Sequence, residues 1–397
     1  MRLVLIADTF PPIRTSGAVQ LKDLAREFAH QDHTLTVLLP SADLKEPWLL
    51  ERLEGIELLR LRSPRFKDVS YMRRTLAELV MPFAMMRNFR KSPLIEERWD
   101  GLIWYSPSIF HGPFVSVLKK SSNCISYLII RDLFPDWAVD MGLMGRGLIY
   151  RFFDAIARYQ YSVADVIGVQ TSGNQKYFNQ WLERPGRKLE VLQNWLDKAP
   201  NSPCSIRVNK TALMGRKVFV YAGNIGVAQG MEILLDLAEK IRYRSDIGFL
   251  IVGRGSDADR LKESAQSRHL DNILFFDEID PDEIPDLYAQ CYAGIVLLDP
   301  RHKSHNIPGK FLTYIRSGLP VLASVNAGND LAHMIRDEQV GQVCETNNVH
   351  ELMQLTEKLL DQIVTDLGLS ARCKDLFNQK FAVEKTVKQI VAALCKR

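Results

Sequence analysis

Short apolar runs alternate with amphipathic helical stretches along this chain, and the alternation starts twice. Strands that alternate with helices form right-handed βαβ units around a parallel sheet. The sequence therefore predicts an α/β fold with two Rossmann-like, doubly wound parallel-sheet domains facing a central cleft. The expected strands are Arg2–Ala7, Leu35–Leu39, Ile56–Leu61, Gly101–Tyr105, Cys124–Ile130 and Asp165–Gln170 in the first half, and Val218–Ala222, Phe249–Val252, Ile273–Phe276, Ala293–Leu297 and Pro320–Ser324 in the second. The helices expected in the second half lie near 230–243, 257–268, 283–290, 309–317 and 350–362.

Residues 198–215 separate the two runs of alternation. They are rich in Pro, Ser and Asn and have no clear period, so we interpret them as an inter-domain linker. The expected domains are residues 1–205 and 206–379, with a C-terminal helix, 380–397, that packs back onto the first domain. Ligands of such sheets bind outside the carboxyl ends of the strands, so the loops that follow the strands are where a site is expected.

Composition excludes several classes of protein. The 397 residues are 46% hydrophobic and 25% charged, which excludes a disordered chain, and a net charge of +4 is too weak to indicate a nucleic-acid partner. The six cysteines are scattered without metal-ligand spacing, and no window holds eighteen uncharged apolar residues. The first apolar run reaches Asp8 too early for a signal peptide, so we expect a cytoplasmic protein.

Two glycine-containing loops follow expected strands of the second half. The first holds Gly223, Gly226 and Gly230, and such a loop either lets backbone N–H groups approach a phosphate or only makes a tight turn. Its spacing does not match the dinucleotide fingerprint. In the second loop, Arg254 is either a phosphate contact or a solvated charge, and Asp257 is placed to cap the next helix.

A third loop, 301–307, is basic and contains histidine, and a helix opens after it at Pro308, Gly309 and Lys310. Neighbouring parallel strands end at one edge of a sheet, so all three loops are expected to converge there. Convergence of three loops is more specific than any loop alone, and it indicates an anionic ligand.

In their order along the chain, these motifs resemble glycosyltransferase family 4, whose fold is GT-B. The resemblance rests on Y-x-G-N-x-G-x-x-Q-G at 221–230, V-G-x-G at 252–255, I-P-x-K-x-x-x-Y-x-x-x-G-x-P-V at 307–321 and FPP…SGA at 10–18. The segment 129–144, IIRDLFPDWAVDMGLM, looks like the bacterial subgroup that adds N-acetylated amino sugars to O-antigen or capsule precursors, such as the N-acetyl-L-fucosamine transferases. The resemblance implies that the first domain binds the acceptor and the second the nucleotide sugar.

The resemblance also implies a donor site. Gly17 would contact the donor diphosphate or the acceptor, and Gly223 and Asn224 would lie under the diphosphate and sugar. Arg254 would lie close to the nucleotide. The donor-binding residues that it implies are Gly17, Gly223, Asn224, Gly226, Arg254, Lys303, His305, Asn306, Ile307, Pro308, Lys310 and Thr313.

The chain departs from the family pattern at four of these motif positions. The usual Arg and Lys of the first glycine loop are Asn224 and Gln229, and the paired glutamates fall on His305 and Thr313. Positive charge for the diphosphate would then come from Arg254, Lys303 and Lys310. Thr313 offers one hydroxyl where a carboxylate could hold two ribose hydroxyls.

Candidate catalytic residues lie in the first half. Arg131 and Asp132 stand where many family members have His–Asp after a strand. His111 follows the strand 101–105 and is either catalytic, in the cleft, or structural. Asp136 is either an acid or the cap of a helix that begins at Trp137.

The segment Arg62–Lys91 carries eight basic residues and two acidic ones, a net charge of +6, together with many Leu, Met and Phe. Such a segment is typical of a contact with an anionic membrane surface. The alternative is an ordinary amphipathic helix packed on the sheet, but its apolar residues are too many for one core face.

The sequence patterns and the resemblance together predict a cytoplasmic, peripheral glycosyltransferase, and the resemblance implies that it retains the anomeric configuration. It would move a sugar from a UDP-sugar to a polyprenyl-diphosphate-linked saccharide in O-antigen or capsule synthesis, by positioning and by stabilising the leaving diphosphate. No Asp-x-Asp motif stands in a suitable loop, so no metal or other cofactor is expected. Two alternatives stay open: a UDP-sugar 2-epimerase of similar fold, and a non-catalytic nucleotide-sugar-binding protein.

Overall fold

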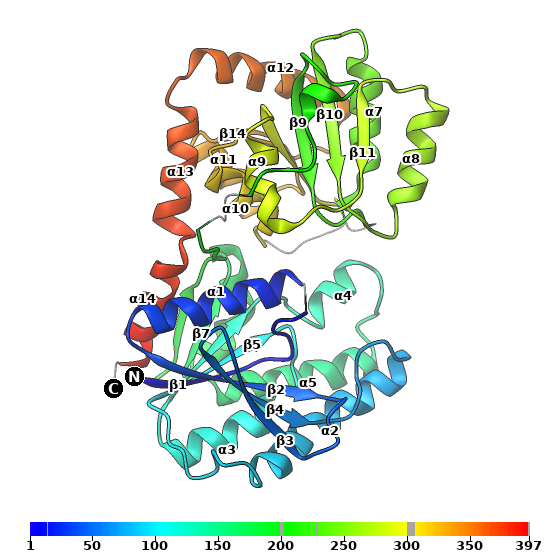
Figure 1. The fold of residues 1–397 in the computed structure, drawn as a ribbon. Coiled ribbons are helices and arrows are strands. Elements are labelled where there is room, and N and C mark those ends of the chain that lie inside the picture. The colour runs from blue at the N-terminus through cyan, green and yellow to red at the C-terminus, as the bar shows by residue number, and fades with distance from the viewer. Residues whose placement is uncertain (14, 199–201, 227–228, 300–305, 396–397) are drawn as a thin grey trace. The chain divides into compact units, whose positions relative to one another are not determined.

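The computed structural model describes residues 1–13, 15–198, 202–226, 229–299 and 306–395. They form two compact units (Figure 1). Unit 1 comprises residues 1–195 and the C-terminal helix from 383, and unit 2 comprises residues 196–382. Each unit is an α/β structure built on one sheet.

The sheet of unit 1 has eight strands among the described residues, in the order β3–β4–β2–β1–β5–β6–β7–β8. Neighbouring strands are parallel, except that β3 is antiparallel to β4. The central strands are buried on both faces, which explains their continuous apolar runs. The strands are β1 (Arg2–Ile6), β2 (Thr34–Ser41), β3 (Trp48–Leu53), β4 (Ile56–Arg62), β5 (Gly101–Ser106), β6 (Ile125–Ile130), β7 (Val166–Val169) and β8 (Lys188–Val191).

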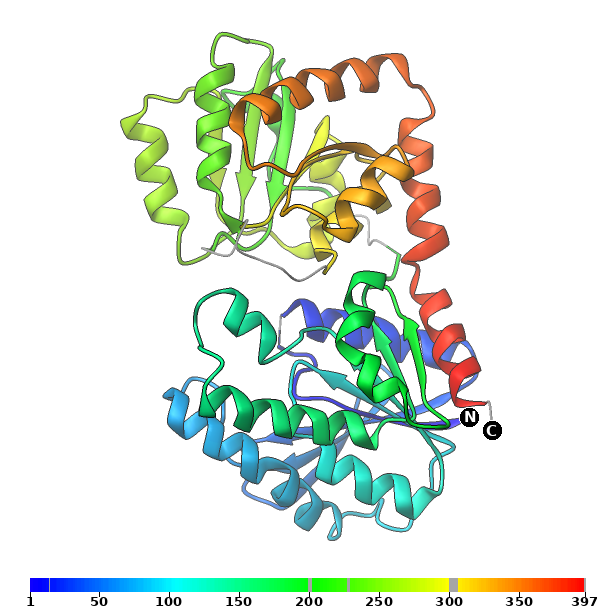
Figure 2. The ribbon, with the colours of Figure 1, turned by 180° about the vertical axis from the view of Figure 1, so that it is seen from behind.

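Helices cover both faces of this sheet. One face carries α1 (Ser16–His30) and α14 (Val383–Leu394), whose Val387, Ile390 and Leu394 enter the core with Leu24 and Phe28 of α1. The other face carries α2 (Tyr71–Phe89), α3 (Gly112–Ser122) and α5 (Leu148–Val163), as Figure 2 shows. The short helices are α4 (Asp136–Asp140) and α6 (Asn179–Leu182).

Unit 2 has a wholly parallel sheet, with six strands among the described residues in the order β11–β10–β9–β12–β13–β14. The strands are β9 (Lys217–Ala222), β10 (Ile247–Val252), β11 (Ile273–Phe276), β12 (Ala293–Leu297), β13 (Val321–Ser324) and β14 (Gly341–Cys344). One face is covered by α7 (Glu232–Ile241), α8 (Ala258–Ser267) and α12 (Val349–Thr365). The other is covered by α9 (Ile284–Tyr288), α10 (Gly309–Arg316), α11 (Asp330–Asp337) and α13 (Leu369–Lys380).

The predicted α/β class with two parallel sheets is confirmed, and each expected strand lies within one to two residues of an observed one. Three strands were missed: β3, β8 and β14. All three lie at sheet edges, where one side of a strand is unpaired. The burial of β3 and β8 is partial, so these strands lack the continuous apolar run that marks the central ones.

The interpretation of residues 198–215 as a linker is wrong. Within the described part of this stretch, Cys204, Ile206, Val208 and Leu213 are buried in the core of unit 2. The chain enters unit 2 earlier, at Leu196, whose N–H donates to the Phe381 carbonyl at 3.1 Å. The stretch has no helical or strand period because it packs as an irregular segment with its backbone bonded to side chains.

Asp286 and Gln290 supply two of those side chains. The Cys204 N–H donates to Asp286 Oδ2 at 2.7 Å, and the Val208 N–H donates to Gln290 Oε1 at 3.0 Å. These bonds satisfy backbone groups that no sheet or helix satisfies, which lets an irregular segment be buried.

Candidate functional site

The two glycine loops of unit 2 touch each other backbone to backbone. The Ile225 N–H donates to the Arg254 carbonyl at 2.9 Å. A Cβ on Gly253 would lie 2.0 Å from the Gly223 oxygen, and a Cβ on Gly255 would lie 2.0 Å from the Ile225 oxygen. Only glycine fits at 253 and 255, so these residues serve the close packing of the loops after β9 and β10.

Lys310, in the first turn of α10, reaches across to the first glycine loop. Its Nζ donates to Tyr221 Oη at 2.9 Å and lies 4.4 Å from the centre of that ring. Tyr221 Oη donates in turn to the Asn224 carbonyl at 2.6 Å. A Cβ built on Gly223 would lie 3.8 Å from the lysine Nζ. The structure thus brings Gly223 and Lys310 together at the carboxyl edge of the sheet.

Burial lowers the pKa of the Lys310 ammonium to about 8, because the group loses hydration. Pro308 occupies the N-cap position of α10 in extended conformation, without a side-chain cap. The first N–H groups of a helix have no acceptor within the helix, so this end favours an anion.

Tyr314 fixes α10 to the strand edge. Its Oη donates to the Val220 carbonyl and accepts from the Ala222 N–H, both at 3.1 Å. The ring lies over Gly294, where a Cβ would come within 2.3 Å of it. Tyr221 and Tyr314 both stand inside the sequence motifs, but the motifs indicate no role for either. Tyr314 positions α10, which carries Lys310, and Tyr221 positions the loop that carries Gly223.

Asn224 and Gln229, which replace the family's Arg and Lys, bond to each other. Gln229 Oε1 accepts from Asn224 Nδ2 at 3.4 Å and from the Gly226 N–H at 3.0 Å. Two neutral amide side chains, hydrogen-bonded to each other across the loop, therefore stand at the positions where the family pattern has two cations.

The Arg254 side chain is 76% exposed. Its Nε forms an ion pair with Glu278 Oε2 at 2.8 Å. Thr313 Oγ1 donates to the Lys310 carbonyl at 2.8 Å and lies 3.4 Å from Tyr288 Oη. The cation and the hydroxyl expected to contact the nucleotide both have protein partners in this structure.

The rest of the third loop is described in part. Ile307 is buried, whereas Asn306 and Pro308 are partly exposed. Lys303 and His305 lie outside the described residues.

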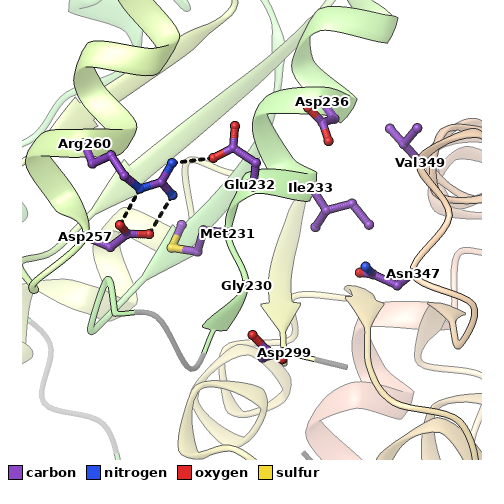
Figure 3. Close-up of a pocket in the computed structure, with 10 residues that line it drawn as sticks. All are labelled: Gly230, Met231, Glu232, Ile233, Asp236, Asp257, Arg260, Asp299, Asn347 and Val349. Atoms are coloured by element: carbon purple, nitrogen blue, oxygen red, sulfur yellow. Dashed lines mark hydrogen bonds and ion pairs between the residues drawn. The ribbon is translucent and has the colours of Figure 1, made fainter. Parts of the chain in front are cut away.

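A cavity of about 470 Å³ lies at the same edge of unit 2 (Figure 3). Arg260 binds both carboxylate oxygens of Asp257, at 2.6 and 2.8 Å, and Glu232 at 2.7 Å, which ties α8 to α7. An acidic lining does not suit a diphosphate, and none of the predicted donor residues lines it. The lining residues are Gly230, Met231, Glu232, Ile233, Asp236, Asp257, Arg260, Asp299, Asn347 and Val349.

Gly17 lies in the first turn of α1, in unit 1. A Cβ there would lie 3.2 Å from Tyr105 Oη and 3.4 Å from Thr9 Cγ2. Thr15 caps the helix by accepting the Ala18 N–H at 3.2 Å. Gly17 therefore places a helix N-terminus close to the ends of β1 and β5.

His111 is fully buried at the N-cap position of α3. Neither ring nitrogen has a hydrogen-bond partner among the described residues. Burial lowers its pKa to about 4, against a weaker opposing effect of Asp8. The imidazole is neutral at pH 7 and enclosed, which does not match its expected place in an open cleft.

Arg131 and Asp132 follow β6 at the carboxyl edge of the sheet of unit 1. The Arg131 carbonyl accepts from Gln170 Nε2 at 2.9 Å, and its guanidinium lies 5.8 Å from the ring of Trp195. Asp132 is exposed. Of the three candidate catalytic residues, Asp132 is the most exposed, since Arg131 is half-buried and His111 is fully buried.

Asp136, for which the sequence left an acid and a helix cap as alternatives, does not cap a helix. Asp136 is the first residue of α4, and Pro135 holds the N-cap position. Its Oδ1 accepts from Tyr150 Oη at 2.9 Å and lies 3.5 Å from the Arg146 guanidinium. Asp257 does hold the N-cap position of α8, but its carboxylate binds Arg260 rather than the helix backbone.

The basic segment Arg62–Lys91 contains α2, which has two apolar faces. Ala77, Met81, Met85 and Phe89, four residues apart, pack in the core of unit 1. A second set is exposed: Tyr71, Met72, Leu76, Val80 and Phe83. No helix among the described residues is long and apolar enough to cross a bilayer.

Residues 205–373 match the family model described as glycosyl transferases group 1. Over 367 residues the chain is 25% identical to "Putative colanic acid biosynthesis glycosyl transferase WcaI" of Escherichia coli K12, covering 87% of this chain and 86% of that protein. It is 23% identical over 246 residues to "Probable glycosyltransferase WbjE" of Pseudomonas aeruginosa, covering 61% of each. The crystal structure of Anabaena Alr3699/HepE in complex with UDP matches with a TM-score of 0.68 and 15% identity, covering 99% of both chains.

The chain is a glycosyltransferase of GT-B fold. The expected enzyme class and fold are thereby confirmed, and the name of one relative, WcaI, places that protein in colanic acid biosynthesis. The matched region begins at 205 and contains both glycine loops and Lys310.

Proposed function

We propose that this glycosyltransferase is a retaining enzyme of family 4 that takes its sugar from a UDP-sugar. The observation that carries the proposal is the ammonium of Lys310 beside Gly223, with a pKa lowered by burial. A buried ammonium without a counter-charge is unfavourable, and a diphosphate at Gly223 would supply that charge. HepE, whose fold is similar, is described in complex with UDP.

In this proposal, Lys310 and the N-terminus of α10 stabilise the charge that develops on the leaving diphosphate. These groups are already held in place by Tyr221 and Tyr314, so little reorganisation is needed when the sugar–phosphate bond breaks. Arg254 would join them after leaving Glu278, and Lys303 would add charge from the third loop. Catalysis then needs no enzymic nucleophile and no divalent metal.

The donor sugar that we propose is an N-acetylated deoxy-amino sugar such as N-acetyl-L-fucosamine. The acceptor is a polyprenyl-diphosphate-linked saccharide in O-antigen or capsule synthesis. The motif IIRDLFPDWAVDMGLM supports the sugar class, and the name of WcaI supports a polysaccharide acceptor. In this proposal, Gly17, Arg131 and Asp132 of unit 1 contact the donor or the acceptor.

We also place the enzyme on the inner face of the cytoplasmic membrane, bound through Arg62–Lys91. The support is the exposed apolar stripe of α2, which stands within a segment of net charge +6. A bilayer surface with anionic lipids offers partners to both kinds of side chain.

A panel of UDP-sugars tests the donor. The purified chain should release UDP slowly from one UDP-amino-sugar without acceptor, and faster when a lipid-linked saccharide is added. The product should keep the anomeric configuration of the donor, as judged by NMR. Interconversion of the UDP-sugar into its 2-epimer would replace this proposal by an epimerase. Tight UDP binding without turnover of any donor would replace it by a binding protein.

Chelation tests the metal-free mechanism. Turnover should be unchanged in excess EDTA, because the positive charge at the diphosphate is expected to come from protein groups. Loss of turnover in EDTA with recovery in Mg²⁺ or Mn²⁺ would contradict this part of the proposal.

A further inference from the structure

A second group of exposed apolar side chains lies in residues 142–152, which comprise the turn after α4 and the first five residues of α5 and are called the α4–α5 turn below. Leu148 is 83% exposed and Leu143 is 72% exposed, and Ile149 and Phe152 are also exposed. The surfaces of soluble monomeric proteins usually expose such side chains singly, whereas a cluster within eleven residues indicates an interaction surface.

The turn projects from the body of unit 1. A Cβ built on Gly142, Gly145 or Gly147 would meet no atom within 4 Å. Farther along α5, Ala157 is buried in the core and Phe153 and Ile156 pack against it. The helix is thus anchored by its middle, while its first turn and the preceding loop leave their apolar side chains uncovered.

The charges beside these side chains favour an anionic bilayer as the partner. Residues 142–152 contain Arg146 and Arg151 and no acidic residue. The Arg146 guanidinium lies 5.2 Å from the centre of the Tyr150 ring and 3.5 Å from Asp136. Exposed Leu, Ile and Phe between arginines are what binding at the lipid headgroup boundary requires.

The exposed stripe of α2 belongs to the same side of unit 1. Helices α2 and α5 cover one face of the sheet, on either side of α3, and Figure 2 shows their N-terminal ends at the same end of the sheet. Helices that follow parallel strands begin at the carboxyl edge, where Arg131 and Asp132 also lie.

We propose that the α4–α5 turn is a second membrane-contacting element, which inserts Leu143, Leu148 and Ile149 into an anionic bilayer beside α2. The inference rests on the proposed use of a lipid-linked acceptor. Two contacts fix the orientation of unit 1 on the bilayer, whereas one helix alone would leave it free to rotate. The carboxyl edge of its sheet is then held near the headgroups, where a lipid-linked saccharide emerges.

Vesicle binding of the double variant Leu148→Ser/Ile149→Ser tests the proposal. Burial of one such side chain favours binding by roughly tenfold or more. Partition onto vesicles containing phosphatidylglycerol should therefore fall about a hundredfold relative to the parent. The matched control is Val364→Ser/Leu367→Ser, which removes two exposed apolar side chains at the end of α12 in unit 2 and should change partition less than twofold.

UDP affinity, measured by titration calorimetry, separates this proposal from the donor chemistry. Both double variants should bind UDP as the parent does, since all four positions are exposed and outside the glycine loops. If the Leu148→Ser/Ile149→Ser variant pellets with vesicles like the parent, the α4–α5 turn is not a membrane contact, and the donor proposal is unaffected. If instead the variant converts a dimeric parent to a monomer without loss of vesicle binding, the turn is a contact between copies of this chain, and the proposal is wrong.

Discussion

The carboxyl edges of the two sheets are built in opposite ways. In unit 2, glycines at 253 and 255 let two loops touch, and two tyrosines hold Lys310 beside Gly223. In unit 1, the α4–α5 turn near the carboxyl edge has glycines at which an added Cβ would meet no atom within 4 Å, and its leucines are exposed. A small charged ligand needs donors held at fixed positions, whereas a fluid surface needs apolar side chains that are free to enter it. This difference supports the two proposals, which place the diphosphate in unit 2 and the membrane contact in unit 1.

Removal of four arginines from the basic segment should have the largest effect. Each basic side chain near an anionic leaflet contributes about 1 kcal/mol. Replacing Arg73, Arg74, Arg87 and Arg90 by Ser should therefore lower co-sedimentation with anionic vesicles by about three orders of magnitude at low salt. Binding of the parent should also weaken as salt rises.

The matched control removes four exposed cations from unit 2: Lys240, Arg242, Lys358 and Lys374. It changes the net charge equally, so a specific contact through unit 1 predicts near-parental vesicle binding for it. UDP affinity should survive in both variants. Equal loss in the two would mean that net charge alone drives binding and that unit 1 has no special surface.

One alanine in each unit tests the difference in packing. Gly255→Ala would place a Cβ 2.0 Å from the Ile225 oxygen, and it should lower the free energy of unfolding by about 3 kcal/mol. Gly145→Ala meets nothing within 4 Å and should change it by less than about 0.5 kcal/mol. Chemical denaturation followed by far-ultraviolet circular dichroism, which reports on the helices and strands of both units, measures both. Similar effects of the two alanines would contradict the contrast.

The pH dependence of the free energy of unfolding tests whether His111 is buried in unit 1. Its pKa is about 4 when folded and near 6.5 when unfolded. Between these values the unfolded chain binds a proton that the folded chain does not, so stability falls as pH drops from 6.5 toward 4. His111→Leu should abolish up to about 3 kcal/mol of that fall, whereas the exposed His30→Leu should not alter it. Parallel pH profiles of parent and His111→Leu would show that the imidazole is not buried.

The fold was largely predictable because central parallel strands are buried on both faces and leave long apolar runs. Edge strands β3, β8 and β14 lack that signal. Residues 198–215 were misassigned because Asp286 and Gln290, far away in the sequence, bond to the backbone of this stretch, and composition alone cannot distinguish such a segment from a linker.

The site was predictable as a set of loops but not as a set of contacts. The motifs placed Gly223 and Lys310 at one edge of the sheet, and the structure confirms that these two residues lie close together there. They gave no sign that Arg254 pairs with Glu278 or that His111 is enclosed, because both depend on side chains far apart in the sequence. The exposure of Leu148 was equally hidden, since apolar residues in a helical pattern usually face a core.

The role of Lys310 at the diphosphate is tested by the affinity of the Lys310→Met variant for UDP, measured by calorimetry at pH 7. We expect the binding free energy to weaken by roughly 1.5–3 kcal/mol, the value of a charge-assisted bond, and to stay unchanged in the surface control Lys240→Met. Arg254→Ala should have a smaller effect, because that guanidinium must first leave Glu278. The parent's affinity should also decline as pH rises above about 8, where Lys310 loses its proton, and that of Lys310→Met should not. Unchanged UDP affinity in Lys310→Met would contradict the assignment of the diphosphate to this edge of unit 2.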